Sequence, residues 1–357
     1  MVLYMLAVLA IGLWCARRNR TSDDFYLGGR KLGPLVTAMS AEASDMSSWL
    51  LMGLPGLAYL TGIADAGWTA IGLAVGTYIN WLVVAKRLRR YTVVANNSIT
   101  LPVYFENRFK DKTKILRIVS SLFIMVFFLV YTASQFTAGA KLFEAAFGVP
   151  YTIGLLIGGV IIIGYTFMGG FKAVAWTDLI QGIIMFFALI VMPFIIISKL
   201  GGWDQTVIQF KGFESVSGEV FSWLPKTTAG TVNVLLLVSS IGWGLGYFGQ
   251  PHILTRFMAV RSSKEIQPAR VIATIWVIIT LSCAVILGML GCLYINGGLA
   301  NDSLSSLVQG DKEKIFMVLI QSIFGDSGNI WGMLLSGLFL TAILAAIMST
   351  ADSQLLV

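Results

Sequence analysis

Long apolar runs dominate this chain and limit what it can fold into. A segment that crosses a bilayer as a helix needs about 20 predominantly apolar residues. The backbone of such a segment must satisfy its own hydrogen bonds, so each run is expected to be helical. The sequence supplies nine runs near this length, at residues 2–16, 36–62, 67–85, 115–142, 149–170, 174–198, 229–254, 269–295 and 331–357.

Composition excludes a water-soluble enzyme. Only 12% of the 357 residues are charged and the mean hydropathy is +0.81, whereas soluble domains carry about 25% charged residues. The three cysteines lie in apolar stretches and predict no disulfide framework, and a single histidine predicts no transition-metal site. The sequence therefore predicts an all-α polytopic membrane protein.

Lysine and arginine set the expected orientation. With the N-terminus outside, most basic residues, Arg256 among them, fall in loops that face the cytoplasm, as the positive-inside rule requires. The net charge of +7 is then a topology signal, which predicts a multi-pass protein of the cell membrane with no nucleic-acid partner. The other side keeps six of the 25 basic residues, which are Lys141, Lys199, Lys211, Lys226, Lys312 and Lys314.

The chain ends at Val357 inside an apolar run, with no polar tail. A terminal carboxylate within the bilayer would lack water, which is costly. We therefore expect a sequence truncated at the C-terminus, whose full-length parent has further spans.

Polar residues interrupt the run at 36–62, which carries Glu42 and the segment Ser44–Ser48 with Asp45 at its centre. Acidic side chains inside a span are costly and indicate a function. Serine and aspartate compete for backbone hydrogen bonds, and a break at membrane depth is tolerated where it lines a cavity. We expect a broken helix of the kind that forms midplane sites in secondary transporters. The alternative is a kinked packing helix.

The run at 229–254 contains four closely spaced glycines followed by Pro251, which predicts a second break. Trp243, Tyr247 and Pro251 recur every four residues, so a regular helix would present them on one face. Such a wall suits a small, partly apolar organic solute. The alternative is a glycine seam between packed helices.

Hydroxyl groups near the end of the chain form a candidate cation site. Ser349 and Thr350 follow a stretch of small residues and precede Asp352 and Ser353. Hard monovalent cations prefer oxygen ligands, and the opened backbone of the second run could supply the others. The alternative is that both hydroxyls bond their own helix.

Two further residues have two interpretations each. Asp178 stands near the expected start of the sixth run, where it either caps the helix or lies on an ion path. Tyr131, in the fourth run, either points its hydroxyl into a cavity or belongs to the core.

Motifs along the whole chain carry a resemblance to a known family. They include residues 26–34 (YLGGRKLGP), 43–47 (ASDMS), 49–56 (WLLMGLPG), 242–252 and 348–350. On these motifs the sequence resembles the sodium:solute symporter family, and residues 243–251 resemble its proline-carrying branch. The resemblance implies a symporter, not an enzyme, that imports L-proline with sodium as the co-transported ion and has no organic cofactor.

The resemblance also implies the leucine-transporter fold, in which two inverted five-helix repeats follow an extra first helix. Residues 1–30 would form the extra helix and a cytoplasmic loop, and residues 31–200 the first repeat. Residues 229–357 would form an incomplete second repeat of the same transmembrane domain.

The family's functional positions fall on specific residues of this chain. Sodium would be held by the backbone oxygens of Ala43, Met46 and Ala346 and by the hydroxyls of Ser349 and Thr350. Proline would lie among Ser47, Ser48, Tyr131, Trp243, Tyr247 and Pro251. The coupling and ion-path residues would be Asp45, Arg30 and Asp178, and an additional sodium site in some members matches Asp352 and Ser353.

Three positions depart from the proline carriers: Ser48 and Glu42 stand where glycine is common, and Val103 stands where an acid is usual. The Ser48 side chain narrows or repolarises the pocket, so a related solute such as a betaine or another amino acid is the first alternative. A different alternative is a transporter-like sensor domain of a signalling protein.

Overall fold

The computed structural model describes residues 1–357 except 18–19, 212–213, 216–217, 227–229 and 326–328, and the described chain is almost entirely helical. The elements of the first half are α1 (Val2–Ala16), α2 (Ser22–Leu27), η1 (Gly28–Arg30), α3 (Pro34–Ser48), η2 (Trp49–Gly53), α4 (Leu54–Thr61), α5 (Ile63–Ile79), η3 (Asn80–Ala85), α6 (Lys86–Val94), α7 (Leu101–Phe109), α8 (Ile115–Phe147) and α9 (Tyr151–Lys199).

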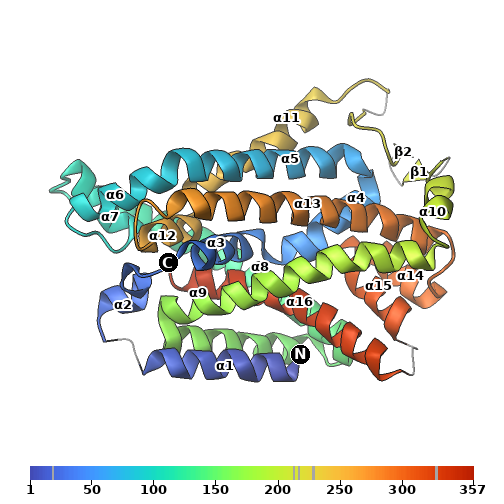
Figure 1. Ribbon diagram of the computed structural model, residues 1–357, viewed down its shortest axis with the longest axis horizontal. Coiled ribbons are helices and arrows are strands. Elements are labelled where there is room, and N and C mark those ends of the chain that lie inside the picture. The colour runs from blue at the N-terminus through green and yellow to red at the C-terminus, as the bar shows by residue number, and fades with distance from the viewer. Residues whose placement is uncertain (18–19, 212–213, 216–217, 227–229, 326–328) are drawn as a thin grey trace.

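A short antiparallel pair, β1 with β2, lies between two helical regions of the second half (Figure 1). The elements of this half are α10 (Trp203–Phe210), β1 (Glu214–Ser215), β2 (Gly218–Glu219), α11 (Val234–Gly242), η4 (Trp243–Gly249), α12 (Pro251–Ala259), α13 (Ile266–Asn296), α14 (Asp302–Gly310), η5 (Lys312–Lys314), α15 (Ile315–Phe324) and α16 (Ile330–Leu355).

All nine predicted apolar runs are helical over most of their length. Among the described residues, five stretches are long and apolar enough to cross a membrane, and α1 and Val234–Gly249 are shorter apolar helices. The number of crossings stays a prediction. The five long stretches are Ile63–Val94, Ile115–Phe147, Tyr151–Lys199, Ile266–Asn296 and Ile330–Leu355.

Gly170 divides α9 into two helices that correspond to the fifth and sixth predicted runs. Its backbone is left-handed, with φ 60° and ψ −164°. A Cβ atom at this position would lie 2.7 Å from the Phe25 ring and 2.9 Å from the Phe25 carbonyl oxygen. Both the dihedral angle and the close approach of α2 therefore require glycine here.

Helix α3 lies in the middle of the bundle (Figure 1), in contact with α9, α12, α13 and α16. Ten of its residues are buried, including serines and Glu42, so this helix is polar and enclosed by protein. The outer helix α8 instead exposes apolar side chains such as Phe123, Phe127 and Leu129, as a lipid-facing surface does. The fold thus places this polar segment away from lipid.

Glycines join α5 to η4 at very short range. A Cβ atom on Gly244 would lie 2.0 Å from the Gly72 carbonyl oxygen, and one on Gly76 would lie 2.4 Å from the Gly244 carbonyl oxygen. Such close backbone contact is possible only with small residues. The region 229–254 is therefore both a broken helix and a glycine seam.

This seam predicts a difference between two glycines of the same element. Gly244→Ala should destabilise the protein by about 1–3 kcal/mol, because the added methyl group overpacks a backbone contact. Gly246→Ala is the matched control, since nothing lies within 4 Å of its Cβ position. Thermal unfolding of the detergent-solubilised variants measures the difference, and equal midpoints would contradict the prediction.

Candidate functional site

The predicted break in the second run is present at Ser47. This residue has φ 54° and ψ −172°, a conformation that is rare for a residue with a side chain and costs about 1–3 kcal/mol. The helix resumes directly as η2 and α4. The Trp49 backbone N–H donates to the Ser47 hydroxyl at 3.1 Å, so the interrupted backbone is partly satisfied by the residue at the break itself.

Oxygen atoms from α3 and α16 meet just before this break. The Ser349 hydroxyl donates to the carbonyl oxygens of Ala43 at 2.8 Å and Ala346 at 3.1 Å. The Thr350 hydroxyl donates to the Ser44 carbonyl oxygen at 2.8 Å. Both hydroxyls thus reach across to α3, and Ser349 also bonds its own helix. These buried oxygens are a donor set that suits a hard monovalent cation, because each hydroxyl also carries lone pairs.

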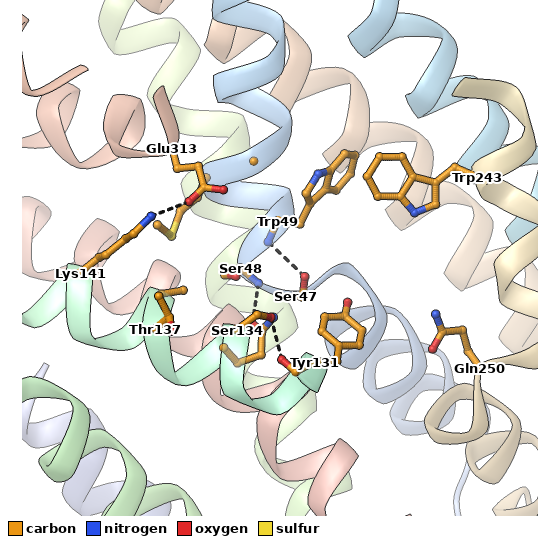
Figure 2. A pocket seen from close by; sticks show the side chains of 14 residues that line it. Ser47, Ser48, Trp49, Tyr131, Ser134, Thr137, Lys141, Trp243, Gln250 and Glu313 are labelled. Carbon is orange, nitrogen blue, oxygen red and sulfur yellow. Dashed lines mark hydrogen bonds and ion pairs between the residues drawn. The ribbon is translucent and has the colours of Figure 1, made fainter. Parts of the chain in front are cut away.

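A cavity of about 530 Å³ opens on the other side of the break (Figure 2). The Trp49 and Trp243 rings lie 4.9 Å apart between centroids and form an aromatic wall. The rest of the lining combines hydroxyl and amide groups with Lys141, Glu313 and a few small or apolar residues, an arrangement that suits a small solute with one polar and one apolar part. The lining residues are Ser47, Ser48, Trp49, Met52, Gly53, Tyr131, Ser134, Gln135, Thr137, Ala138, Lys141, Trp243, Gln250 and Glu313.

Four of the six predicted solute residues line this cavity: Ser47, Ser48, Tyr131 and Trp243. Tyr131 thus faces a cavity, which was one of its two interpretations. The other two predicted residues lie elsewhere. Tyr247 is only 6% exposed and its hydroxyl bonds Asp45, and Pro251 lines a neighbouring hollow that also includes Tyr131.

The prediction that Trp243, Tyr247 and Pro251 share one helix face is wrong. Residues 243–249 form a 3-10 helix, in which three residues make a turn, so a residue four positions on is rotated by about 120°. Gln250 is extended, with φ −76° and ψ 104°, and separates this helix from α12. Trp243 therefore reaches the cavity while Tyr247 packs inward.

Sequence reasoning missed five residues of α8 that line the cavity: Ser134, Gln135, Thr137, Ala138 and Lys141. They follow Tyr131 at offsets that place them along the same side of a helix. A polar stripe on an otherwise apolar span is the signal that would have found them. Gln250 and Glu313 carry no such signal, because they come from separate elements that meet only in the folded chain.

The mouth of the cavity carries an ion-pair cluster that joins α8 to η5. The Lys141 ammonium group lies 2.9 Å from both the Asp311 and the Glu313 carboxylates. Partial burial opposes ionisation of Asp311, but the hydrogen bond and charge of Lys141 outweigh it and lower the pKa of that carboxyl group. The Asp311 carboxyl group is therefore ionised at neutral pH. Lys141 and Glu313 of this cluster also line the cavity, where an entering solute can reach them (Figure 2).

A second charged network is fully buried behind α3. The Arg256 guanidinium lies 3.1 Å from the Asp178 carboxylate, and neither side chain is exposed. The Ser40 hydroxyl donates to the same carboxylate at 2.6 Å, and Arg256 also donates to the hydroxyls of Ser40 and Ser353. A buried ion pair needs this many partners, because desolvating each charge costs several kcal/mol.

Asp352 of α16 extends this network. It accepts hydrogen bonds from the Tyr165 hydroxyl and, at 3.1 Å, from the Ser353 hydroxyl. Ser353 in turn donates to the Ser349 carbonyl oxygen at 2.6 Å. The network therefore lies directly next to the oxygen cluster of α3 and α16.

Two predictions are corrected by this network. Arg256 is not in a cytoplasmic loop, because it is fully buried on α12. Asp178 does not cap a helix, because the second half of α9 begins after Gly170, about two turns earlier. Residues 251–259 (PHILTRFMA) contain no local pattern that predicts an inward-pointing arginine.

The two acidic residues of α3 have partners on η3 and η4. Glu42 is 2% exposed, and its Oε1 atom accepts from the Trp81 indole N–H at 2.9 Å. Its Oε2 atom has no hydrogen-bond partner among the described residues. Asp45, about one turn later, meets the Tyr247 hydroxyl. Tyr247 thus contacts the half-buried Asp45 and does not line the cavity.

Arg30 lies apart from the break. Its guanidinium donates to the Thr92 hydroxyl at 3.2 Å and to the carbonyl oxygens of Met258 at 3.1 Å and Ser98 at 2.8 Å. Burial, and then the positive charge of Arg89, lower the pKa of Arg30. Its described hydrogen bonds tie η1 to α6 and α12, and none of them reaches Asp45.

Comparison with known proteins identifies relatives along the whole chain. The model of the sodium:solute symporter family matches residues 25–357. The sodium/proline symporter of Salmonella typhimurium is 47% identical over 356 residues, which cover 99% of this chain and 67% of the relative. The high-affinity proline transporter PutP of Bacillus subtilis is 46% identical over 350 residues, with 98% and 69% covered.

Two solved structures share the fold. An outward-open, substrate-bound Na⁺-coupled sialic acid symporter has a TM-score of 0.75 at 20% identity, covering 99% of this chain and 70% of its own. Mhp1, a nucleobase-cation-symport-1 family transporter in a closed conformation, has a TM-score of 0.54 at 13% identity, with 94% and 67% covered. The helical transporter fold expected from the sequence is thereby confirmed.

The buried ion pair predicts an asymmetric response to substitution. Asp178→Asn should destabilise the protein by about 3–5 kcal/mol, because it leaves the Arg256 charge buried without its counter-ion. The double variant Asp178→Leu with Arg256→Met should recover part of that loss, since neither charge is then buried.

Glu265→Gln is the control for this experiment, because Glu265 pairs with the exposed Arg261 and such pairs contribute about 0–1 kcal/mol. Thermal unfolding in detergent measures all three variants. An Asp178→Asn variant as stable as Glu265→Gln would contradict the prediction.

Proposed function

The chain belongs to the sodium:solute symporter family, and from this premise we propose that it imports L-proline in symport with sodium. The sodium/proline symporters of three bacterial species and two Bacillus subtilis proline transporters are 41–47% identical to it over nearly its whole length. The observation that carries the proposal is the break at Ser47, with cation-type oxygens on one side and a solute-sized cavity on the other.

In this proposal sodium binds where α3 meets α16. The ligands are the carbonyl oxygens of Ala43, Met46 and Ala346 and the hydroxyls of Ser349 and Thr350. Support comes from the hydrogen bonds that already join Ser349 to the Ala43 and Ala346 carbonyl oxygens. On cation binding, both hydroxyls turn their protons away and present lone pairs to the ion.

Proline binds in the cavity between the break and the aromatic wall. Its carboxylate lies at the start of η2, where backbone N–H groups and the positive end of the helix dipole favour an anion. Its ring packs on Trp243, with Ser47, Ser48 and Tyr131 around it. Tyr247 acts indirectly through Asp45, and Pro251 shapes the wall beside Tyr131.

Coupling follows from the shared backbone of α3. Ala43 and Met46 precede the break and Ser47 and Ser48 form it, so each ligand stabilises the same backbone conformation as the other. Affinities for sodium and solute therefore rise together and reciprocally. This is the mechanism by which the sodium gradient drives uptake.

The buried network supplies the inner part of the ion path. Asp178, Asp352 and Ser353 offer oxygens that lead from the Ser349 region toward the cytoplasmic side, where the Gly170 break of α9 and the C-terminal end of α16 lie, with Arg256 as their fixed counter-charge. Asp45 and Arg30 support coupling and gating from α3 and η1 respectively. Because Ser353 connects Asp352 to Ser349, the proposal also includes a second sodium ion per transport cycle.

We also propose the membrane arrangement expected from the sequence: a cell-membrane protein with its N-terminus outside. Residues 31–200 form the first inverted repeat and residues 229–357 belong to the second, after residues 1–30 as an extra first helix. The breaks at Ser47 and Gln250 support this division, because each interrupts the first long helix of its repeat.

Uptake of radiolabelled proline tests the function directly. Cells that produce the protein should accumulate proline with an inward sodium gradient and not with potassium, and only unlabelled proline should compete. Competition by betaine or by another amino acid would instead favour a related solute, the alternative suggested by the serine at position 48. Failure to take up any solute with sodium would overturn the proposal.

The sodium site predicts the effect of removing two hydroxyls. Ser349→Ala combined with Thr350→Ala should raise the sodium concentration for half-maximal uptake by about tenfold or more, which corresponds to about 1.4 kcal/mol of lost cation binding. Ser306→Ala on α14, whose exposed hydroxyl bonds the Ser303 carbonyl oxygen, is the control. Sodium dependence equal to that of the control would contradict the assignment.

A further inference from the structure

The backbone N–H groups that begin the second half of the broken helix already have acceptors. The Ser48 N–H donates to the Gln135 side-chain carbonyl oxygen at 3.2 Å, and the Trp49 N–H donates to the Ser47 hydroxyl at 3.1 Å. Both acceptors are neutral, and all four residues line the cavity; Figure 2 labels Ser47, Ser48 and Trp49 among them. These are the donors to which the proposed function brings a carboxylate.

The Gln135 amide is held in one orientation. The side chain is 2% exposed, so it has little freedom. Its Nε2 atom donates to the Ser134 hydroxyl at 3.4 Å, and that hydroxyl donates to the Tyr131 carbonyl oxygen at 2.7 Å. The amide nitrogen is thereby engaged along α8, and the amide oxygen faces Ser48 across the cavity edge.

The position of the Ser48 N–H is set by the break and not by residue 48. Ser48 has φ −55° and ψ −22°, an ordinary helical conformation, whereas Ser47 carries the left-handed angle. A glycine at position 48 would therefore relieve no backbone strain. The Ser48 N–H points at Gln135 because the helix is interrupted at Ser47.

We propose that Gln135 is a specificity-determining residue that stands in for the solute carboxylate. Its amide oxygen holds the Ser48 N–H until a carboxylate displaces it. This inference rests on the proposed function, in which the carboxylate of the solute binds at the start of η2.

The physical basis is a competition between acceptors. A carboxylate forms hydrogen bonds roughly twice as strong as those of a neutral acceptor and gains from the helix dipole, so it displaces the amide. A neutral carbonyl or hydroxyl of a solute gains nothing by exchanging with Gln135. The residue therefore sets how strongly the cavity prefers a carboxylate-bearing solute, and it satisfies the strained backbone when no solute is bound.

Three substitutions at Gln135 test the competition, because they should shift the KM for proline in opposite directions. Gln135→Leu and Gln135→Met remove the acceptor, so the KM for proline should fall by about fivefold, the factor of one net hydrogen bond. Gln135→Glu supplies a permanent carboxylate, so the KM for proline should rise by at least about tenfold. Inhibition by pyrrolidine, which lacks the carboxyl group, should be the same in the wild type and the Leu and Met variants.

Sodium-dependent uptake of labelled proline measures these values, with Ser120→Ala as the control on α8, where its hydroxyl bonds the Leu116 carbonyl oxygen. A KM that is raised or unchanged in both the Leu and Met variants would overturn the inference. So would equal shifts for proline and pyrrolidine, or loss of folded protein in both variants, since these indicate a structural role.

The wild type separates this inference from the proposed function. Normal sodium-dependent proline uptake by the wild type, together with the wrong signs in the variants, overturns the role of Gln135 alone. Absence of sodium-dependent uptake in the wild type overturns both.

Discussion

The interrupted backbone of α3 at Ser47 is the constraint on which the site depends. Lipid cannot satisfy free N–H and C=O groups, so a break inside a membrane protein has to be enclosed by other helices that supply partners. Here α16 brings the hydroxyls of Ser349 and Thr350 to the carbonyl side, and α8 brings Gln135 to the N–H side. One strained residue thus leaves carbonyl oxygens on one side of the break and backbone N–H groups on the other.

Charge placement follows the same logic on a larger scale. The buried charges of Arg256 and Asp178 are paired and each takes part in several hydrogen bonds, because isolated charges in the interior are too costly. The pair joins α9 to α12, and Ser40 and Ser353 connect it to α3 and α16. The helices that contribute cation-type oxygens are therefore held to one another by the network that leads away from them. A movement of one of these helices would therefore shift the others.

Much of the fold and part of the site could be predicted from local pattern. Apolar run length located the helices, and the density of Ser and Asp located the break. Prediction failed where it assumed a regular helix: Trp243 and Tyr247 diverge because η4 is a 3-10 helix. It also failed for Arg256, since the residues that draw an arginine inward lie far away in the sequence. Gln135 was overlooked although it belongs to the polar stripe of α8, and its partner, the Ser48 N–H, could not be predicted because it lies far away in the sequence.

The sequence by itself determined that this chain is a helical membrane protein, that its second run is broken and which family it belongs to, because these depend on composition, spacing and motifs along a continuous segment. The tertiary structure decided which oxygens meet across α3 and α16, which aromatic side chains face the cavity and which acid pairs with Arg256. Those outcomes depend on helix rotation and on contacts between residues that are 78 to 306 positions apart. Hydrogen bonds of about 3 Å require that geometry, and no local pattern encodes it.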